Sequence, residues 1–531
     1  MHRCRAGRAR RAPADSGSAC SAPSAVAARR TAPCSPPPSS PSPPPWPPPP
    51  APGPPAAPGG AVSALPPPRP AGIGDPLFPR LGNPGYDVLG YDIALAYPGR
   101  NDTPMTARTE ITARATDRLP RINLDFTRGT VRGVTVNGRP ADHARAGEDL
   151  VVTPARTLYP GERLRVAVRH TSDPRGGGGG WIRTRDGLAM ANQADAARRV
   201  FPGNDHPADK ARFTFRVTAP EDLTVVANGR RLARERDGAR TTWTYRTAHP
   251  MATELAQVSI GRSAVLRGTG PHGLPLRHVV PERDRRAARP VVDRTSAQIA
   301  WMERHVGRYP LETYGVLSVD APMNFALETQ TLSVFGRDFL RAVAEHPERG
   351  EGVLVHELAH QWFGNSVTPR RWSDLWLNEG HATWYQALFT DERHDRGSLV
   401  RRMRAAYEQS DRWRADGGPP AAPRRPAEGG QLELFRPVVY DGSALVLYAL
   451  RQEIGAAAFA ELQRTWVTRH RDGTAGTADF VALASEVAGR DLEGFLHAWL
   501  YEERTPPMPG HPGWKSAKPA EPAQPAERSQ R

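Results

Sequence analysis

The chain has 531 residues, a length that accommodates two or three domains. Its 71 Lys and Arg exceed its 56 Asp and Glu, and a net charge of +15 on its own favours a polyanionic partner such as nucleic acid. Between residues 71 and 510, however, 59 basic and 53 acidic residues leave only +6, so most of the excess lies in the two ends. That balance is ordinary for an enzyme, and we expect no nucleic-acid partner for this central region.

The cations and cysteines are distributed unevenly. Only Lys210, Lys515 and Lys518 are lysines, and the other basic residues are arginines, which with abundant Ala, Gly and Pro indicates a GC-rich coding sequence. The three cysteines all lie within the first 34 residues, so we expect no disulfide and no thiolate metal site in the folded part. No apolar stretch approaches the ~18 residues that span a bilayer, and we expect no transmembrane segment.

Residues 1–75 are predicted to form a disordered leader rich in Pro and Arg, because the run from Cys34 to Pro58 consists mostly of Pro, Ser and Ala. Its basic start is similar to the first part of a signal peptide. The segment that follows contains Asp15 and lacks Leu, Ile and Phe. An export signal and an incorrectly assigned start codon are both left open, and with them a secreted or a cytoplasmic location.

Residues 76–265 are predicted to form a β-rich domain, because short segments of alternating apolar and polar residues are separated by turn residues. Asn137-Gly138 indicates a hairpin turn. The glycine run from Gly176 to Gly180 lacks the Lys-Ser/Thr of a phosphate-binding loop and favours a surface loop. The expected strands are YDVLGYDIALAY, RTEITARA, RINLDF, VRGVTVNGRPA, DLVVTPA, RLRVAVRHT, RFTFRVTA, LTVVANGRRLA, TTWTYRTA and ELAQVSIG.

Residues 266–505 are predicted to form a mainly helical domain, and residues 506–531 are predicted to form a disordered, Pro-rich tail. Thr477 and Asp491 are expected as N-caps, and Gly489 as a helix stop. Helices are expected at about Ser296–Val306, Phe339–Ala344, Gly350–Phe363, Leu375–Phe389, Ser398–Gln409, Ser443–Ile454, Ala457–His470, Ala478–Ala488 and Leu492–Tyr501.

One segment carries recognisable chemistry: VLVHELAHQWFGN, from Val353 to Asn365. In a helix, His356 and His360 lie one turn apart on one face and can bind the same metal ion. Glu357 beside them is placed to act on a metal-bound water rather than on the metal. The alternative is a helix with two solvated or packed histidines.

A third ligand is available in the next helix. Glu379, in SDLWLNEGHATWYQALF, follows His360 after 18 intervening residues. Two histidines and one carboxylate can hold a zinc ion and leave its fourth position open for water. His381 lies two residues further, about 200° around the helix, and we expect it to pack rather than to bind metal.

These motifs resemble the gluzincin aminopeptidases of the M1 family, whose zinc-binding pattern is HExxH, 18 residues and then Glu. The resemblance covers residues 74–510. It rests on HELAHQWFGN and WLNEGHATW and on further blocks in the family's order, MANQADAARRVFPGNDHPADKARFTF, HPMATELAQVSIG, APMNFALETQT, VVYDGSALVLYALR and LHAWLYEERTPPMPG.

The resemblance implies an α+β multidomain fold: a saddle-like β domain (76–265) followed by a thermolysin-like, mainly helical catalytic domain (266–505). It implies a short form without the family's C-terminal helical domain. It also implies one zinc ion per chain, bound by His356, His360 and Glu379. The expected protein is a monomeric zinc aminopeptidase that hydrolyses the first peptide bond of peptides with a free N-terminus.

The resemblance further implies roles for four residues around the metal. Glu357 is the general base, and Tyr440 donates a hydrogen bond to the developing oxyanion. Glu328 binds the free ammonium of the substrate, and Gln193 assists it. The alternatives are that Tyr440 only caps a helix, that Glu328 is a solvated loop carboxylate and that Gln193 is an ordinary polar loop residue.

The sequence departs from the family pattern at Phe325 and Thr329, where Gly and Asn are usual, so the first subsite is expected to be reshaped. Three other functions are left open: an epoxide hydrolase with aminopeptidase activity, a catalytically inactive binding scaffold, and nucleic-acid binding through residues 1–30. An inactive relative is expected to have lost a ligand, the base or the tyrosine, and this chain retains all five residues.

Overall fold

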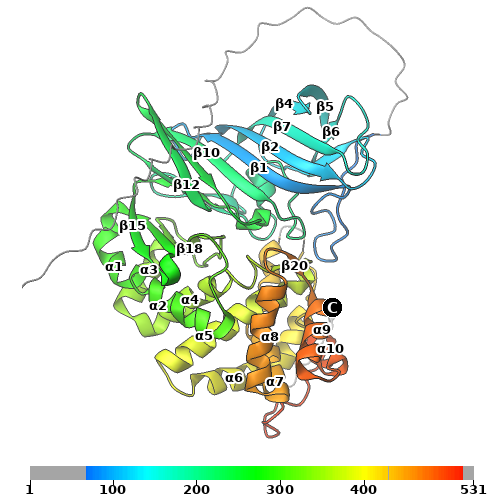
Figure 1. Cartoon of the computed structure of the whole chain (residues 1–531), viewed down its shortest axis with the longest axis vertical. Coiled ribbons are helices and arrows are strands. Elements are labelled where there is room, and N and C mark those ends of the chain that lie inside the picture. Colours follow the sequence, from blue (N-terminus) through cyan, green and yellow to red (C-terminus); the bar gives the residue numbers. More distant parts are fainter. Residues whose placement is uncertain (1–66, 428–429, 518–531) are drawn as a thin grey trace, which may run out of the picture. The chain divides into compact units, whose positions relative to one another are not determined.

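A computed structural model describes residues 67–427 and 430–517. The first part of the fold is a ten-stranded sheet. The strand order is β12-β13-β10-β1-β2-β7-β4-β5-β6-β3, and Figure 1 shows β10, β1, β2 and β7 side by side. The strands are β1 (Tyr86–Ala96), β2 (Met105–Ala115), β3 (Ile122–Asp125), β4 (Val131–Val136), β5 (Arg139–Ala146), β6 (Asp149–Thr153), β7 (Arg163–Ser172), β10 (Arg212–Pro220), β12 (Arg230–Asp237) and β13 (Arg240–Arg246).

Alternating side chains explain this sheet. In β1, Tyr91, Ile93 and Leu95 are buried and their neighbours are less so, which gives the sheet one core-facing side. Asn137 and Gly138 have φ angles of 51° and 78°, as the two-residue turn between β4 and β5 requires. The predicted β-rich region and its hairpin are therefore confirmed.

Two four-stranded sheets complete the β structure. One has the order β11-β14-β9-β8, and the other the order β15-β16-β17-β18. The prediction of a mainly helical region after residue 266 missed this second sheet, because its last two strands are buried apolar runs too short to show a period. The strands are β8 (Gly180–Arg183), β9 (Leu188–Ala191), β11 (Thr224–Ala227), β14 (Val258–Gly261), β15 (Ser263–Thr269), β16 (Pro275–Pro281), β17 (Val316–Val319) and β18 (Ser333–Gly336).

The strand expected from Glu254 begins only at Val258, because Thr253–Leu255 forms a 3₁₀ turn. The Leu255 carbonyl accepts the N–H of Gln330 at 3.3 Å and the side-chain amide of Asn228 at 3.0 Å. Tertiary hydrogen bonds thus replace a strand ladder at this point.

Helices dominate the rest of the chain, and β19 (Thr368–Pro369) pairs with β20 (Thr474–Ala475) between them. The helix α4 ends four residues before the predicted Phe363, and α1, which contains Pro290, was not predicted. The helices are α1 (Arg285–Val292), α2 (Thr295–Val306), α3 (Arg337–Glu345), α4 (Pro347–Ala359), α5 (Trp376–Arg393), α6 (Ser398–Gly417), α7 (Asp441–Ile454), α8 (Ala456–Arg469), α9 (Thr477–Ala488) and α10 (Glu493–Tyr501).

The predicted helix ends are only partly right. Gly489 has a φ angle of 66° and ends α9, as predicted. The N-cap of α9 is Gly476 rather than Thr477, because the Asp479 carboxylate accepts the Gly476 N–H at 2.8 Å. The N-cap of α10 is likewise Leu492 rather than Asp491.

Both ends of the described chain pack more than the sequence predicted. Asp75 is buried and accepts the N–H of Trp372 at 2.9 Å, and Trp514 stacks on Tyr448 with ring centroids 6.0 Å apart. Asp75 and Trp514 are therefore part of the packed structure, whereas residues 67–70 are exposed. The rest of the predicted leader (1–66) and tail (518–531) lies outside the described residues. Within the described part, no helix is long and apolar enough to cross a membrane.

We predict that Trp514→Ala destabilises the protein, because the half-buried ring stacks on Tyr448 and His511. The free energy of unfolding should fall by about 1–2 kcal/mol, below the cost of truncating a fully buried aromatic, as measured by urea denaturation. Leu232→Ala, at a position 56% exposed, is the control and should change it by less than about 0.5 kcal/mol. Equal stability of both variants would contradict the packing of this segment.

Candidate metal centre and substrate pocket

The three predicted metal ligands meet at one point. His356 lies in the last turn of α4, His360 follows the end of that helix with helical φ and ψ angles of −56° and −25°, and Glu379 lies in the first turn of α5. The Glu379 Oε2 atom is 3.3 Å from the His356 Nε2 atom and 3.5 Å from the His360 Nε2 atom. All three side chains are buried. Of the alternative of two solvated or packed histidines, burial rules out the solvated form.

The donor set fits a tetrahedral divalent ion such as Zn²⁺. Two imidazole nitrogens and one carboxylate oxygen are ligands that zinc prefers, at about 2.0–2.2 Å. Ligands at that distance in tetrahedral geometry lie about 3.4 Å apart, close to the two observed separations. The buried Glu379 Oε2 atom has no hydrogen-bond partner within the described structure, which is consistent with a role as a metal ligand.

Asn378 orients His360. The Nδ1 atom of His360 faces the Asn378 Oδ1 atom and, at 3.2 Å, the carbonyl of Phe363. Because both partners accept hydrogen bonds, they place the ring proton on Nδ1 and leave Nε2 free to bind metal. Gly364 allows this approach: its φ angle is 124°, and a Cβ atom there would lie 2.1 Å from the Asn378 Oδ1 atom.

The electrostatics of the site favour a bound cation. Burial acts to raise the pKa of Glu379, but His360 and His356 outweigh it and lower that pKa to about 2. Burial raises the pKa of Glu357 well above its usual range, and Glu328 and Glu379 raise it further, against the effect of His360. Like charges in a buried pocket repel one another, and a cation among them relieves that repulsion.

Glu357 and Tyr440 lie beside the three ligands. The buried Glu357 Oε2 atom has no hydrogen-bond partner among the described residues. Tyr440 is the N-cap residue of α7, but its side chain makes no capping hydrogen bond, and its ring centroid is 6.0 Å from that of His356. Burial raises the pKa of Tyr440 well above its usual range, and the nearby carboxylates of Glu379, Glu328 and Glu357 add to it, so the phenol remains a donor.

Close contact between α5 and α7 brings Tyr440 to the site. A Cβ atom on Gly380 would lie 2.7 Å from the Cβ atom of Ser443, so the helices could not approach as closely with a larger residue there. Gly380 directly follows Glu379, and Ser443 lies three residues after Tyr440. The glycine therefore sets the distance between a metal ligand and the tyrosine.

Glu328 is 3% exposed, and both its carboxylate and its backbone carbonyl accept hydrogen bonds. Its interpretation as a solvated loop carboxylate is therefore wrong. Its Oε1 atom accepts Gln193 Nε2 at 2.8 Å and Asn378 Nδ2 at 3.3 Å. Its backbone carbonyl accepts Gln361 Nε2 at 3.1 Å and Asn365 Nδ2 at 2.6 Å. Four amide groups thus fix the position of one carboxylate next to the metal ligands.

Glu254 was not predicted to belong to the site. It is buried, and its Oε2 atom has no partner in the described structure. Burial raises its pKa well above the usual range, Glu328 and Asp205 raise it further, and the nearby Gln193 side chain acts to lower it. Its segment looked like part of a strand, so no sequence pattern indicated it. Asn378 was also missed, although it directly precedes the predicted ligand Glu379.

The site opens into a cavity of about 500 Å³. Gln193, Glu328, Tyr440 and the metal ligands line one part of it, and Met323, Phe325, Phe339 and Val353 form an apolar part. Phe325 is 44% exposed, so the residue that replaces the usual Gly presents an aromatic ring to the cavity. His381 lies outside the cavity and stacks on Phe363 at 4.2 Å, which confirms that it packs.

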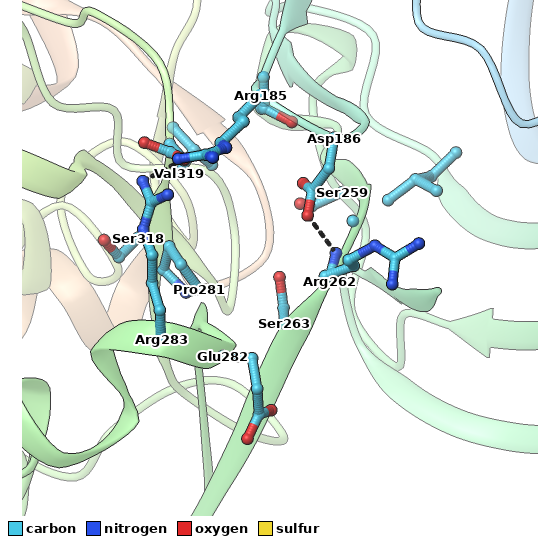
Figure 2. A pocket seen from close by; sticks show the side chains of 14 residues that line it. Arg185, Asp186, Ser259, Arg262, Ser263, Pro281, Glu282, Arg283, Ser318 and Val319 are labelled. Atoms are coloured by element: carbon cyan, nitrogen blue, oxygen red, sulfur yellow. Dashed lines mark hydrogen bonds and ion pairs between the residues drawn. The ribbon is translucent and has the colours of Figure 1, made fainter. Parts of the chain in front are cut away.

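A second cavity, of about 410 Å³, lies away from the metal ligands (Figure 2). Figure 2 shows the Asp186 carboxylate directed at the backbone of Arg262, whose N–H it binds at 3.1 Å. Arg262 also pairs with Asp222, and Arg283 pairs with Asp320. Its arginines are therefore largely matched by carboxylates, and no catalytic constellation lies there among the described residues.

Comparison with known proteins agrees with this geometry. The model of the peptidase family M1 domain matches residues 291–499, and that of the peptidase M1 N-terminal domain matches residues 188–255. Together they match just over half of the chain. The chain therefore belongs to peptidase family M1, and its α+β fold, a β-rich region followed by a helical region, is the one predicted.

Individual relatives support the same assignment. Aminopeptidase M1 of Arabidopsis thaliana is 27% identical over 320 residues, which are 58% of this chain and 36% of that protein. The chain thus spans little more than a third of that relative. The crystal structure of an M1 zinc metallopeptidase from Deinococcus radiodurans superposes with a TM-score of 0.69 at 27% identity, over 82% of this chain and 98% of that one. A variant of the Deinococcus enzyme was solved with the substrate Tyr-Ser-Ala.

We predict that Asn378→Leu weakens metal binding about 10- to 100-fold, because losing a partner that orients a ligating histidine typically costs that much. The affinity would be measured by titration with buffered Zn²⁺. Asn378→Asp is the matched control: it keeps an acceptor for His360 Nδ1 and should bind zinc within a few-fold of the wild type. Equal affinities of wild type and Asn378→Leu would contradict the role of Asn378.

Proposed function

We propose that the chain is a zinc-dependent aminopeptidase that hydrolyses the N-terminal peptide bond of peptides. The observation that carries this proposal is the position of Glu328: ligand atoms of Glu328, Glu357 and His360 all lie within 4.8 Å of one another. A fixed carboxylate at that place can hold a substrate ammonium one residue away from the bond to be cleaved. His356, His360 and Glu379 would hold the zinc ion.

The metal and the side chains have separate tasks. Zinc, when bound, polarises the scissile carbonyl and lowers the pKa of water. Glu357 accepts the proton of the attacking water and delivers it to the departing amine. The Tyr440 hydroxyl donates a hydrogen bond to the carbonyl oxygen as negative charge develops there. Glu328 and Gln193 bind the substrate ammonium and orient the peptide.

Two features support peptides with a free N-terminus as substrates. The hydrogen bonds from Gln193 and Asn378 hold Glu328 in place, yet they supply no positive charge, so the carboxylate remains available to a cation. The structural neighbour from Deinococcus radiodurans was solved with a tripeptide. No observation favours the epoxide hydrolase, and an inactive scaffold has no reason to keep Glu357 and Tyr440 beside three metal ligands.

We predict that Glu357→Gln abolishes turnover without removing the metal. The amide cannot accept the proton of water, so kcat/KM on aminoacyl-4-nitroanilides should fall by about 10²–10⁴-fold, the usual contribution of a general base. Zinc content should stay near one per chain in both proteins, because three protein ligands remain. A fully active Glu357→Gln protein would rule out this mechanism. Removal of zinc by a chelator should abolish the activity of the wild type.

We also predict that the enzyme requires a free amine. The wild type should cleave aminoacyl-4-nitroanilides but not their N-acetylated forms. Glu328→Gln should raise KM for the free substrates about 10- to 100-fold, as expected for the loss of a hydrogen bond to a charged group. Steady-state kinetics on matched pairs of free and acetylated substrates would measure both effects. Equal cleavage of the two forms by the wild type would contradict the role of Glu328.

A further inference from the structure

Lys210 lies in the β-rich region but contacts two loops of the helical region, one of them directly after His360. It lies two residues before the strand β10. Lys210 is partly buried, and burial lowers its pKa to about 7, against the effect of Asp472. It is one of only three lysines in a chain whose other basic residues are all arginines.

The Lys210 ammonium binds three backbone carbonyls. Its Nζ atom donates to the oxygens of Asn365 at 2.9 Å, Ser366 at 2.8 Å and Gly473 at 3.2 Å. Three acceptors match the three N–H groups of an ammonium, which diverge from one atom. A planar guanidinium cannot reproduce that arrangement at one point, which gives a physical reason for a lysine here.

Two of the three carbonyls that Lys210 binds, those of Asn365 and Ser366, belong to the turn that follows His360. The Asn365 N–H donates to the His360 carbonyl at 2.9 Å, and the Asn365 side chain donates to the Glu328 carbonyl at 2.6 Å. The Gly473 carbonyl also accepts the Thr368 N–H at 3.1 Å. A single ammonium therefore ties together two loops and fixes the residue that supports Glu328.

We propose that Lys210 is a positioning residue for substrate binding. By holding Asn365, it fixes the Glu328 backbone and with it the carboxylate that receives the substrate ammonium. This inference rests on the proposed aminopeptidase function. Lys210 touches neither substrate nor metal ligands, so its effect on catalysis passes through Asn365.

The chain offers a matched control. The His249 Nδ1 atom lies 2.8 Å from a carboxylate oxygen of Asp472, so this pair also joins the β-rich region to the loop before β20. Neither His249 nor Asp472 bonds to Asn365 among the described contacts. Replacing His249 removes a contact between the same two regions but none of the hydrogen bonds that Lys210 or Asn365 makes.

The test compares Lys210→Met, Lys210→Arg, Asn365→Leu and His249→Leu with the wild type. We expect both Lys210 variants and Asn365→Leu to raise KM for free aminoacyl-4-nitroanilides about tenfold, with kcat changed less than threefold and zinc content unchanged. His249→Leu should lower thermal stability and leave KM unchanged. In the Lys210→Met/Asn365→Leu double variant, the KM effects should not add, because both act on one contact.

The outcomes separate the two proposals. An active wild type whose Lys210 variants keep the wild-type KM would overturn the role of Lys210 alone. Independent effects in the double variant, or an equal rise in KM in His249→Leu, would also overturn it. A zinc-loaded wild type that cleaves no free aminoacyl substrate would overturn the aminopeptidase and this inference with it. If Lys210→Met does not fold, Lys210→Arg and Asn365→Leu decide the question.

Discussion

Burial of several carboxylates in one pocket is the constraint on which the rest of the site depends. Glu254, Glu328, Glu357 and Glu379 are all at most 5% exposed. Like charges so close together in a medium of low dielectric are costly unless cations or hydrogen-bond donors offset them. Two buried histidines, the amides of Gln193 and Asn378, and the proposed zinc and substrate ammonium all meet that requirement. The chemistry of the ligands thus follows from the electrostatics of the pocket.

Helix packing sets the geometry that this electrostatic arrangement needs. Two glycines, Gly364 and Gly380, allow approaches that any side chain would prevent, one between a turn and Asn378 and the other between α5 and α7. Each approach orients a functional group, since the first fixes the His360 ring and the second brings Tyr440 toward Glu379. Residues without a side chain therefore contribute to the site as much as the charged ones.

The sequence predicted the parts of the site that depend on local spacing. His356 and His360 are one helical turn apart, and Glu379 lies in the next helix, so a helical period and a family pattern were enough to find them. The β-rich region was predictable for the same reason, because its strands alternate. The sheet formed by β15 to β18 was not, since two of its strands, β17 and β18, are fully buried four-residue runs without alternation.

Glu254, Asn378 and Lys210 could not be assigned to the site from the sequence, because their roles depend on partners far along the chain. Glu254 meets Gln193, and Lys210 meets Asn365 and Gly473. Both residues lie in segments that resemble the family, but a carboxylate in a 3₁₀ turn and a lysine before a strand have no local pattern that assigns them a role. The sequence does not show the tertiary contacts that give these residues their roles. It does show that lysine is rare in this chain.

Hydrogen bonds anchor both ends of the segment from Ala321 to Thr331, and the side chain of Phe325 between them lines the cavity. Its start is anchored, because the Asp320 carbonyl accepts the Arg185 N–H at 3.0 Å, and its end is anchored where the Gln361 Oε1 atom accepts the Thr331 N–H at 2.9 Å. Phe325 lies between these anchors and faces the cavity. Changes at Phe325 can therefore alter the apolar wall of the cavity, while Glu328 keeps its distance to the metal ligands.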